Sequence, residues 1–147
     1  MYFDDLPKGY TFETGTRTLG EDDILAFARQ WDPQDFHTDP EAAKASPYGG
    51  LIASGFHSML TAFNLILDAN VWNEASMGSP GIEGIRFLRP VRPGDTLHAR
   101  VEVIEKRESR SRPEMGLVTM DNLVENQDGV LCCTWRGIQL IRRRAAT

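Results

Sequence analysis

The chain has 147 residues, of which 41% are hydrophobic and 25% are charged, and its formal net charge is −5 at pH 7. This composition is typical of a globular protein and excludes an intrinsically disordered chain. The acidic charge argues against nucleic acid or an anionic membrane as the main partner. No apolar run approaches the roughly 18 residues of a membrane span. We therefore expect a single domain over residues 1–147.

The N-terminus and the cysteines predict a cytoplasmic protein. Residues 1–5 lack the basic and apolar regions of a signal peptide. Cys132 and Cys133 are adjacent in an expected strand, where successive side chains point to opposite faces, so they should not form a disulfide with each other. Two cysteines and three scattered histidines give no zinc-ligand spacing, and we expect no metal site.

Three helical segments are predicted in the first half of the chain. Residues 21–31 place apolar side chains on one face at helical spacing, and three acidic residues at their start favour a helix N-terminus. Asp39 followed by Pro40 indicates the start of a short second helix, with Asp39 as its cap. Residues 53–69 are apolar almost all round, so we expect this third helix to be buried on most sides.

The second half of the chain predicts the sheet that covers this helix. Apolar and polar side chains alternate in residues 97–103, which is the pattern of a half-buried antiparallel strand. The expected fold class is therefore α+β, with one antiparallel sheet wrapped around a long central helix. The other predicted segments are strands at 11–18, 82–89, 118–124 and 130–141, a hairpin turn at 126–129 and a polar loop at 106–114.

The segment whose residues are best suited to catalysis lies between the first two helices, where Pro33 and Pro40 restrict the backbone. Asp32 and His37 have four residues between them and can reach one water molecule if the segment folds back. A carboxylate can accept a proton and a histidine can supply one near neutral pH. The spacing alone fits a turn with a structural histidine as well, so it leaves both interpretations open.

Residues 48–57 form a second candidate element at the start of the third helix. Gly55 falls in the first helical turn, where unpaired backbone N–H groups can stabilise a developing oxyanion. The glycines of this segment fit a tight turn and close helix–sheet packing equally well, and Ser54 fits a helix cap. His57 and His98 fit structural or solvent-facing positions.

Three segments together resemble the MaoC-like dehydratases, a family that includes the (R)-specific enoyl-CoA hydratases. Asp32 to His37 is similar to the family's Asp-x4-His motif. Gly50-Leu51-Ile52-Ala53-Ser54-Gly55 resembles its entry into the central helix, and residues 87–97 resemble its Phe-x-x-Pro-Val-x-x-Gly-Asp strand and turn. The resemblance, which covers residues 20–104, implies a hotdog fold.

The resemblance also implies a hydro-lyase that reversibly adds water to the double bond of an enoyl-CoA thioester. Asp32 and His37 would activate the water, and Gly55 would donate its N–H to the thioester carbonyl. We predict that Ser54 and Gln34 also contact the substrate. The family needs no metal or redox cofactor, because CoA is part of the substrate, and it implies a homodimer or a dimer-based oligomer. Arg86, Arg89, Arg92 and Arg142–Arg144 are the candidate contacts for the CoA phosphates.

The sequence departs from the family pattern around the Asp/His pair. Trp31, Gln34 and Asp35 replace a Gly, an Asn and a Pro, although Gln34 keeps an amide that can orient the pair. Asp35 would favour the protonated forms of both partners if it faced them, but we expect it to face solvent. Ser54 stands where a His is frequent. Phe63 stands where the hydratases have a Ser, and in the acyl channel it would alter the accepted substrate.

Two other functions remain open from the sequence. An acyl-CoA thioesterase is compatible with the fold, but the central helix carries no acidic residue before Asp68. A non-catalytic acyl-CoA-binding or regulatory protein is compatible with the departures around the motif. The retained Asp32 and His37 argue against this second alternative.

Overall fold

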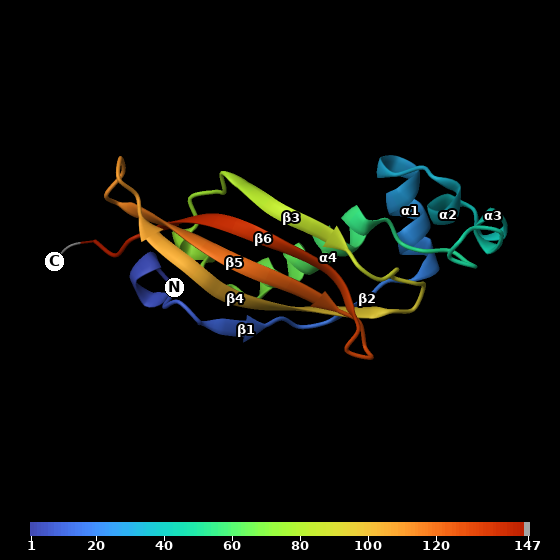
Figure 1. Ribbon diagram of the computed structural model, residues 1–147, viewed down its shortest axis with the longest axis horizontal. Coiled ribbons are helices and arrows are strands. Elements are labelled where there is room, and N and C mark those ends of the chain that lie inside the picture. Colours follow the sequence, from blue (N-terminus) through green and yellow to red (C-terminus); the bar gives the residue numbers. More distant parts are fainter. Residues whose placement is uncertain (146–147) are drawn as a thin grey trace.

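The protein is described by a computed structural model that places residues 1–145. One antiparallel sheet lies over one side of a long helix, with strand order β1-β4-β5-β6-β3 and with β2 paired to β4 (Figure 1). The predicted α+β hotdog fold is thereby confirmed. The strands are β1 (Thr11–Glu13), β2 (Arg17–Thr18), β3 (Gly81–Phe87), β4 (Thr96–Glu108), β5 (Met115–Glu125) and β6 (Leu131–Arg142). The α-helices are α1 (Glu21–Trp31), α2 (Asp35–Thr38), α3 (Pro40–Lys44) and α4 (Gly55–Asp68), and the 3-10 helices are η1 (Phe3–Asp5) and η2 (Asn73–Ala75).

The central helix α4 packs on the inner face of the sheet through side chains such as Met59, Ala62 and Ile66. The prediction that this helix is buried on most sides is wrong for its opposite face. Phe56 and Leu60 are 56% and 53% exposed, because a single sheet covers only one side of a helix. None of the helices within residues 1–145 is long and apolar enough to cross a membrane.

The strands agree with the sequence pattern except at their ends. The hairpin turn at 126–129 is present, with the Gly129 N–H donating to the Asn126 carbonyl. The predicted loop begins later than expected, because β4 continues through residues 106–108. Lys106 holds this extension in place by donating to the carbonyls of Phe3 and Leu6, at 2.7 and 2.8 Å.

The predicted strand at 11–18 is two short strands, β1 and β2, and its interruption has a local cause. The Thr14 hydroxyl oxygen accepts the Ala99 N–H at 2.9 Å, in the place where a strand would offer a backbone carbonyl. The side chain thus competes with the backbone for a ladder hydrogen bond. The N-terminal edge of the sheet is therefore discontinuous.

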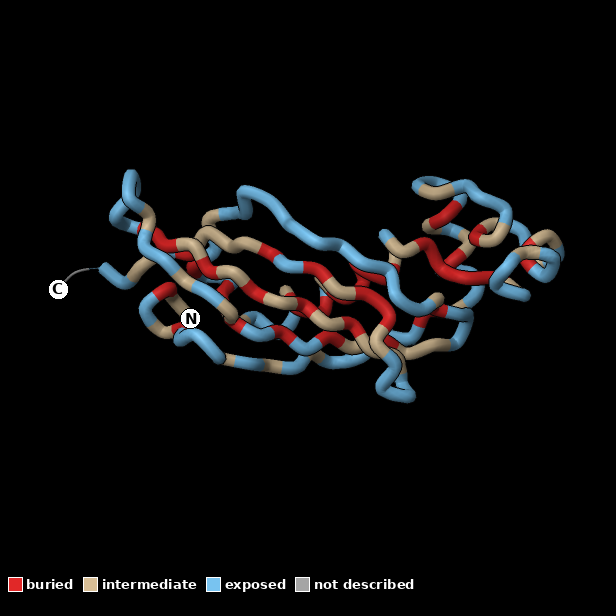
Figure 2. The backbone as a smooth tube through the Cα atoms, viewed as in Figure 1, coloured by how far each residue is buried: buried red, intermediate tan, exposed pale blue. Residues whose placement is uncertain are grey.

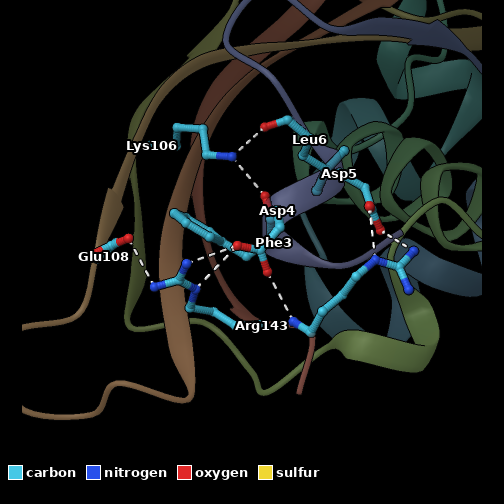
Figure 3. A network of polar contacts seen from close by, with 8 residues as sticks. Phe3, Asp4, Asp5, Leu6, Lys106, Glu108 and Arg143 are labelled. Atoms are coloured by element: carbon cyan, nitrogen blue, oxygen red, sulfur yellow. Dashed lines mark hydrogen bonds and ion pairs between the residues drawn. The ribbon is translucent and has the colours of Figure 1, made fainter. Parts of the chain in front are cut away.

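The two ends of the described chain meet at the end of the sheet far from α1, α2 and α3 (Figures 1 and 3). Arg143 donates to Asp4 at 2.9 Å and to Glu108 at 2.8 Å. Arg144 donates to Asp5 at 2.7 Å. We call these five residues the terminal cluster. Its carboxylates accept hydrogen bonds from charged donors, which favours their ionised forms.

The terminal cluster should make stability depend on pH. Hydrogen bonds from the Arg144 backbone and the Arg143 side chain hold the pKa of Asp4 below its ordinary value of 3.8. A carboxyl group with a lowered folded-state pKa stabilises the protein above its unfolded-state pKa, and this contribution is lost as pH falls through the folded-state value. Asp4→Asn should lower the thermal unfolding midpoint at pH 7 by about 1–3 °C.

The difference between Asp4→Asn and the parent should shrink as the pH falls below 3.8. Glu102→Gln, which removes an exposed carboxylate from β4, is the control and should change the midpoint little. A loss for Asp4→Asn that is equally large at acid pH would contradict an electrostatic origin.

Candidate active site

The end of helix α1 positions Asp32. The residue precedes Pro33, which disfavours helical backbone, so α1 ends at Trp31 with the Asp32 N–H donating to the Ala28 carbonyl. The chain then turns through Gln34 into α2, a single helical turn that the sequence pattern does not predict. This turn brings His37 back toward Asp32.

Asp32 and His37 lie in contact and are both largely buried. His37 Nε2 lies 3.3 Å from Asp32 Oδ2. The other ring nitrogen, Nδ1, lies 2.7 Å from the Ile52 carbonyl oxygen. A carbonyl only accepts hydrogen bonds, so Nδ1 carries a proton and donates it to Ile52. The nitrogen that faces the carboxylate is therefore free to exchange a proton during a reaction.

The second carboxylate oxygen of Asp32 is held by Gln34. Gln34 Nε2 donates to Asp32 Oδ1 at 2.7 Å, so the longer amide in this sequence still reaches its neighbour. Each oxygen of the carboxylate thus has a defined partner, Gln34 on one side and His37 on the other. Asp35 is exposed and is not among the residues that line the adjoining cavity.

The surroundings of Asp32 keep its carboxyl group ionised near neutral pH. Burial acts to raise the pKa of Asp32 and is the largest single effect. The hydrogen bond from Gln34, the neighbouring Ser54 hydroxyl and the His37 ring act in the opposite direction, and together they hold the pKa below its ordinary value of 3.8. An ionised carboxylate in this position is suited to accept a proton.

A cavity of about 410 Å³ opens beside the pair, at the N-terminal end of α4. Gly55 lies in its wall, and as the first residue of the helix its N–H has no intrahelical acceptor. A Cβ at this position would lie 2.7 Å from the Phe87 ring, so any larger residue would force this ring to move. The other lining residues are Asp32, Gln34, Phe36, His37, Tyr48, Ile52, Ala53, Phe56, Ser58, Phe87, Leu88, Arg89, Pro90, Val91, Cys132 and Cys133.

Ser54, which was predicted to contact the substrate, and Phe63, which was considered for the acyl channel, do not line this cavity. Ser54 is fully buried behind the cavity wall, and its hydroxyl neither caps α4 nor has a hydrogen-bond partner of normal geometry within residues 1–145. It is close enough to Asp32 to contribute to its lowered pKa. Phe63 packs against the hydrophobic core and does not line the cavity, so it does not shape an acyl channel directly.

The candidate arginines separate into two groups. Arg89 lines the mouth of the cavity, and Arg92 lies nearby, where it donates to the Tyr48 carbonyl at 2.7 Å. Arg86 is exposed on β3. The C-terminal arginines 143 and 144 belong to the terminal cluster at the far end of the sheet, so within one chain they do not reach this site.

The remaining histidines and the cysteines have structural surroundings. The His57 ring stacks on Phe27 at 4.5 Å, and burial lowers its pKa. His98 lies 3.5 Å from Glu125 on the polar face of the sheet. Cys132 and Cys133 are free thiols, as expected, and burial raises the pKa of Cys133 to about 11. No group of three or more His, Cys, Asp or Glu side chains in residues 1–145 is arranged to hold a metal ion.

The cavity wall contains residues that sequence reasoning missed. Phe56 and Phe87 form an edge-to-face pair at its mouth, with ring centroids 5.9 Å apart. Ser58, Cys132 and Cys133 line its inner part. The helical spacing of Gly55 and Ser58 could have indicated the serine, because residues three apart share a helix face. Nothing local in the sequence indicates that β6 contributes the cysteines.

A MaoC-like domain matches residues 6–126, and the chain therefore belongs to the MaoC-like dehydratase family. YdeM of Bacillus subtilis is 32% identical over 130 residues, which cover 88% of this chain and 91% of YdeM. The crystal structure of a MaoC-like dehydratase from Rhodospirillum rubrum is 32% identical, with a TM-score of 0.93 and 99% of each chain covered. The (R)-hydratase PhaJ1 of Pseudomonas aeruginosa is 26% identical, with a TM-score of 0.77 and coverage of 97% of this chain and 86% of PhaJ1.

The Asp32–Gln34 contact can be tested without any substrate. A carbon-13 NMR titration of the Asp32 side-chain carboxyl should give a midpoint below 3.8. Gln34→Leu removes a hydrogen bond that stabilises the ionised form, so the midpoint should move upward. Gln30→Leu, at an exposed position on α1, is the control. An unchanged midpoint in Gln34→Leu would show that the amide does not hold the carboxylate in solution.

Proposed function

We propose that this protein is a hydratase/dehydratase that reversibly adds water to the double bond of an enoyl-CoA thioester. The observation that carries the proposal is the contact between Asp32 and His37 in the wall of a cavity that also contains the Gly55 N–H. An acid–base pair and a helix N-terminus within one cavity meet the two needs of this reaction. These are proton transfer and stabilisation of negative charge on the thioester oxygen.

In this proposal the thioester carbonyl oxygen accepts the Gly55 N–H at the positive end of the α4 dipole. Gln34 orients Asp32 through one of its amide N–H groups. Its second N–H and its carbonyl remain available to the substrate, because Gln34 lines the cavity. The exposed Arg89 and Arg92 are available for the CoA phosphates at the cavity mouth. The chemistry uses no metal or redox cofactor.

The proton transfers follow from the hydrogen bonds of the pair. Asp32 accepts a proton from water as the hydroxide adds to Cβ, and an imidazolium at His37 delivers its Nε2 proton to Cα. The Asp32 carboxylic acid then returns its proton to His37 Nε2 across the 3.3 Å contact. One water molecule has been consumed and both groups regain their initial state. Dehydration is the reverse sequence.

A thioesterase fits the described residues less well. The only acidic residue of α4 is Asp68, at the end of the helix remote from the cavity. It lies 3.4 Å from Arg17 in an ion pair. No carboxylate of α4 therefore faces the position proposed for the thioester carbonyl.

Removal of either member of the pair should abolish most of the activity. With crotonyl-CoA or another enoyl-CoA, loss of absorbance at the enoyl thioester band should be about 10²–10⁴-fold slower in Asp32→Asn and in His37→Ala. Asp35→Asn removes an exposed carboxylate two or three residues from the pair and is the matched control. Release of free thiol by the parent protein would instead indicate a thioesterase. Tight acyl-CoA binding without turnover would indicate a binding protein.

We also propose that two copies associate through β3. This strand is an edge strand of the sheet, and all seven of its residues are exposed (Figure 2). The exposed side chains of Ile82, Ile85, Phe87, Phe56 and Leu60, from β3 and α4, form what we call the apolar edge. A second copy pairing its β3 antiparallel to the first would continue the sheet by two-fold symmetry and cover the apolar edge.

Sedimentation velocity measures this association directly. The parent protein should sediment as a dimer, and Ile85→Lys should weaken dimerisation at least about 30-fold, since it places a charge in the centre of the buried patch. Val130→Lys changes an exposed apolar residue in the β5–β6 turn, outside the apolar edge, and should leave the dimer intact. A monomeric parent protein, or equal effects of the two variants, would refute the proposed interface.

A further inference from the structure

The inner part of the active-site cavity contains polar groups that the proposed reaction does not use. Ser58 lines the cavity and is only 3% exposed. Within residues 1–145 its hydroxyl makes no hydrogen bond to another residue. Cys132 and Cys133, 2% and 1% exposed, lie in the same wall. The mouth differs, because Phe56 and Phe87 there are exposed and apolar.

A serine in this position is unexpected from packing alone. Its buried neighbours on α4 include Met59 and Ala62, which belong to the hydrophobic core. A buried hydroxyl without a partner destabilises a protein, and nearly all such groups in folded proteins are hydrogen-bonded. Within residues 1–145, Ser54 Oγ is a buried atom without a partner but the Ser58 hydroxyl is not, because it opens onto the cavity, where water can reach it. A ligand that fills the cavity must therefore replace the hydrogen bond that water makes to Ser58, or it loses affinity.

The spacing of Gly55 and Ser58 along α4 places the Ser58 hydroxyl beside the acyl group of the substrate. Ser58 follows Gly55 by three residues, which is about 4.5 Å along the helix axis. If the thioester oxygen accepts the Gly55 N–H, the Ser58 hydroxyl meets the acyl chain a few bonds beyond the carbonyl carbon. The CoA portion leaves in the opposite direction, toward Arg89 at the mouth.

The charges around the cavity select a neutral group over a carboxylate. Among the described lining residues, Arg89 is the only arginine or lysine, and it is exposed and donates to the Leu88 carbonyl. The raised pKa values of Cys132 and Cys133 keep the two thiols uncharged. A carboxylate beside Ser58 would have no arginine or lysine to pair with, and His37 is already in contact with Asp32. An unpaired buried charge is strongly unfavourable.

We propose that the acyl group carries a neutral polar substituent, a hydroxyl or a carbonyl, which hydrogen-bonds to Ser58 a few bonds beyond the thioester. This inference rests on the proposed function for the placement of the thioester. Ser58 then determines specificity, because an alkyl substrate would leave its hydroxyl unpaired in the complex, and a site built around such a hydrogen bond rejects analogues that lack it.

The test compares crotonyl-CoA with its γ-hydroxylated analogue. The parent protein should favour the hydroxylated substrate by at least about 10²-fold in kcat/KM. Ser58→Ala should lose this preference, because the hydroxylated substrate loses its hydrogen bond and crotonyl-CoA no longer leaves a hydroxyl unpaired, and Ser58→Thr should restore part of it. Thr61→Val removes another buried hydroxyl of α4 that does not line the cavity, and it should keep the preference.

Binding of butyryl-CoA and γ-hydroxybutyryl-CoA, measured by calorimetry, separates this inference from the proposed function. Hydration of both enoyl-CoA substrates with equal efficiency, unaffected by Ser58→Ala, would overturn the inference and leave the hydratase proposal intact. If neither is hydrated, tighter Ser58-dependent binding of the hydroxylated thioester would support the inference for a binding protein. Equal binding of the two thioesters would overturn it.

Discussion

The hydrogen bond from His37 Nδ1 to the Ile52 carbonyl connects the segments on which the site depends. Beside it, the Ile52 N–H donates to the Phe36 carbonyl at 3.0 Å, and the Ala53 N–H donates to the Val91 carbonyl at 2.8 Å. Three stretches distant in sequence thus meet at one point: α2, the entry to α4 and the loop between β3 and β4. The same bonds orient the imidazole toward Asp32 and fix where the N-terminus of α4 emerges.

The fold explains how polar groups come to lie beside the apolar core. The small helices α1, α2 and α3 gather at one end of the sheet, where α4 begins, and they cover a region that the strands do not reach (Figure 1). The backbone N–H groups at the start of α4 have no acceptor within the helix. Helix α2 places His37 beside them without taking all of these N–H groups as hydrogen-bond partners. The far end of the sheet is closed instead by charged side chains of the chain's two ends (Figure 3).

The sequence predicts the long elements well because each has a continuous burial pattern. Alternation over residues 97–103 and the apolar run at 53–69 correctly identified β4 and α4. Spacing and side-chain chemistry left the Asp32–His37 contact open, and the resemblance decided it, since α2 is a single turn with no pattern of its own. The placement of Ser54 behind the wall, the packing of Phe63 and the contribution of β6 to the cavity depend on tertiary contacts, which local sequence does not encode.

The discontinuity between β1 and β2 has a consequence for growth of the sheet. A long, flat, unpaired strand is a template on which further chains can add and lead to fibrils. Here the N-terminal edge offers strands of three and two residues, separated where the Thr14 hydroxyl replaces a backbone acceptor. An incoming chain finds no continuous ladder there. The interruption therefore protects the protein from open-ended aggregation on the side of the sheet that lies opposite β3.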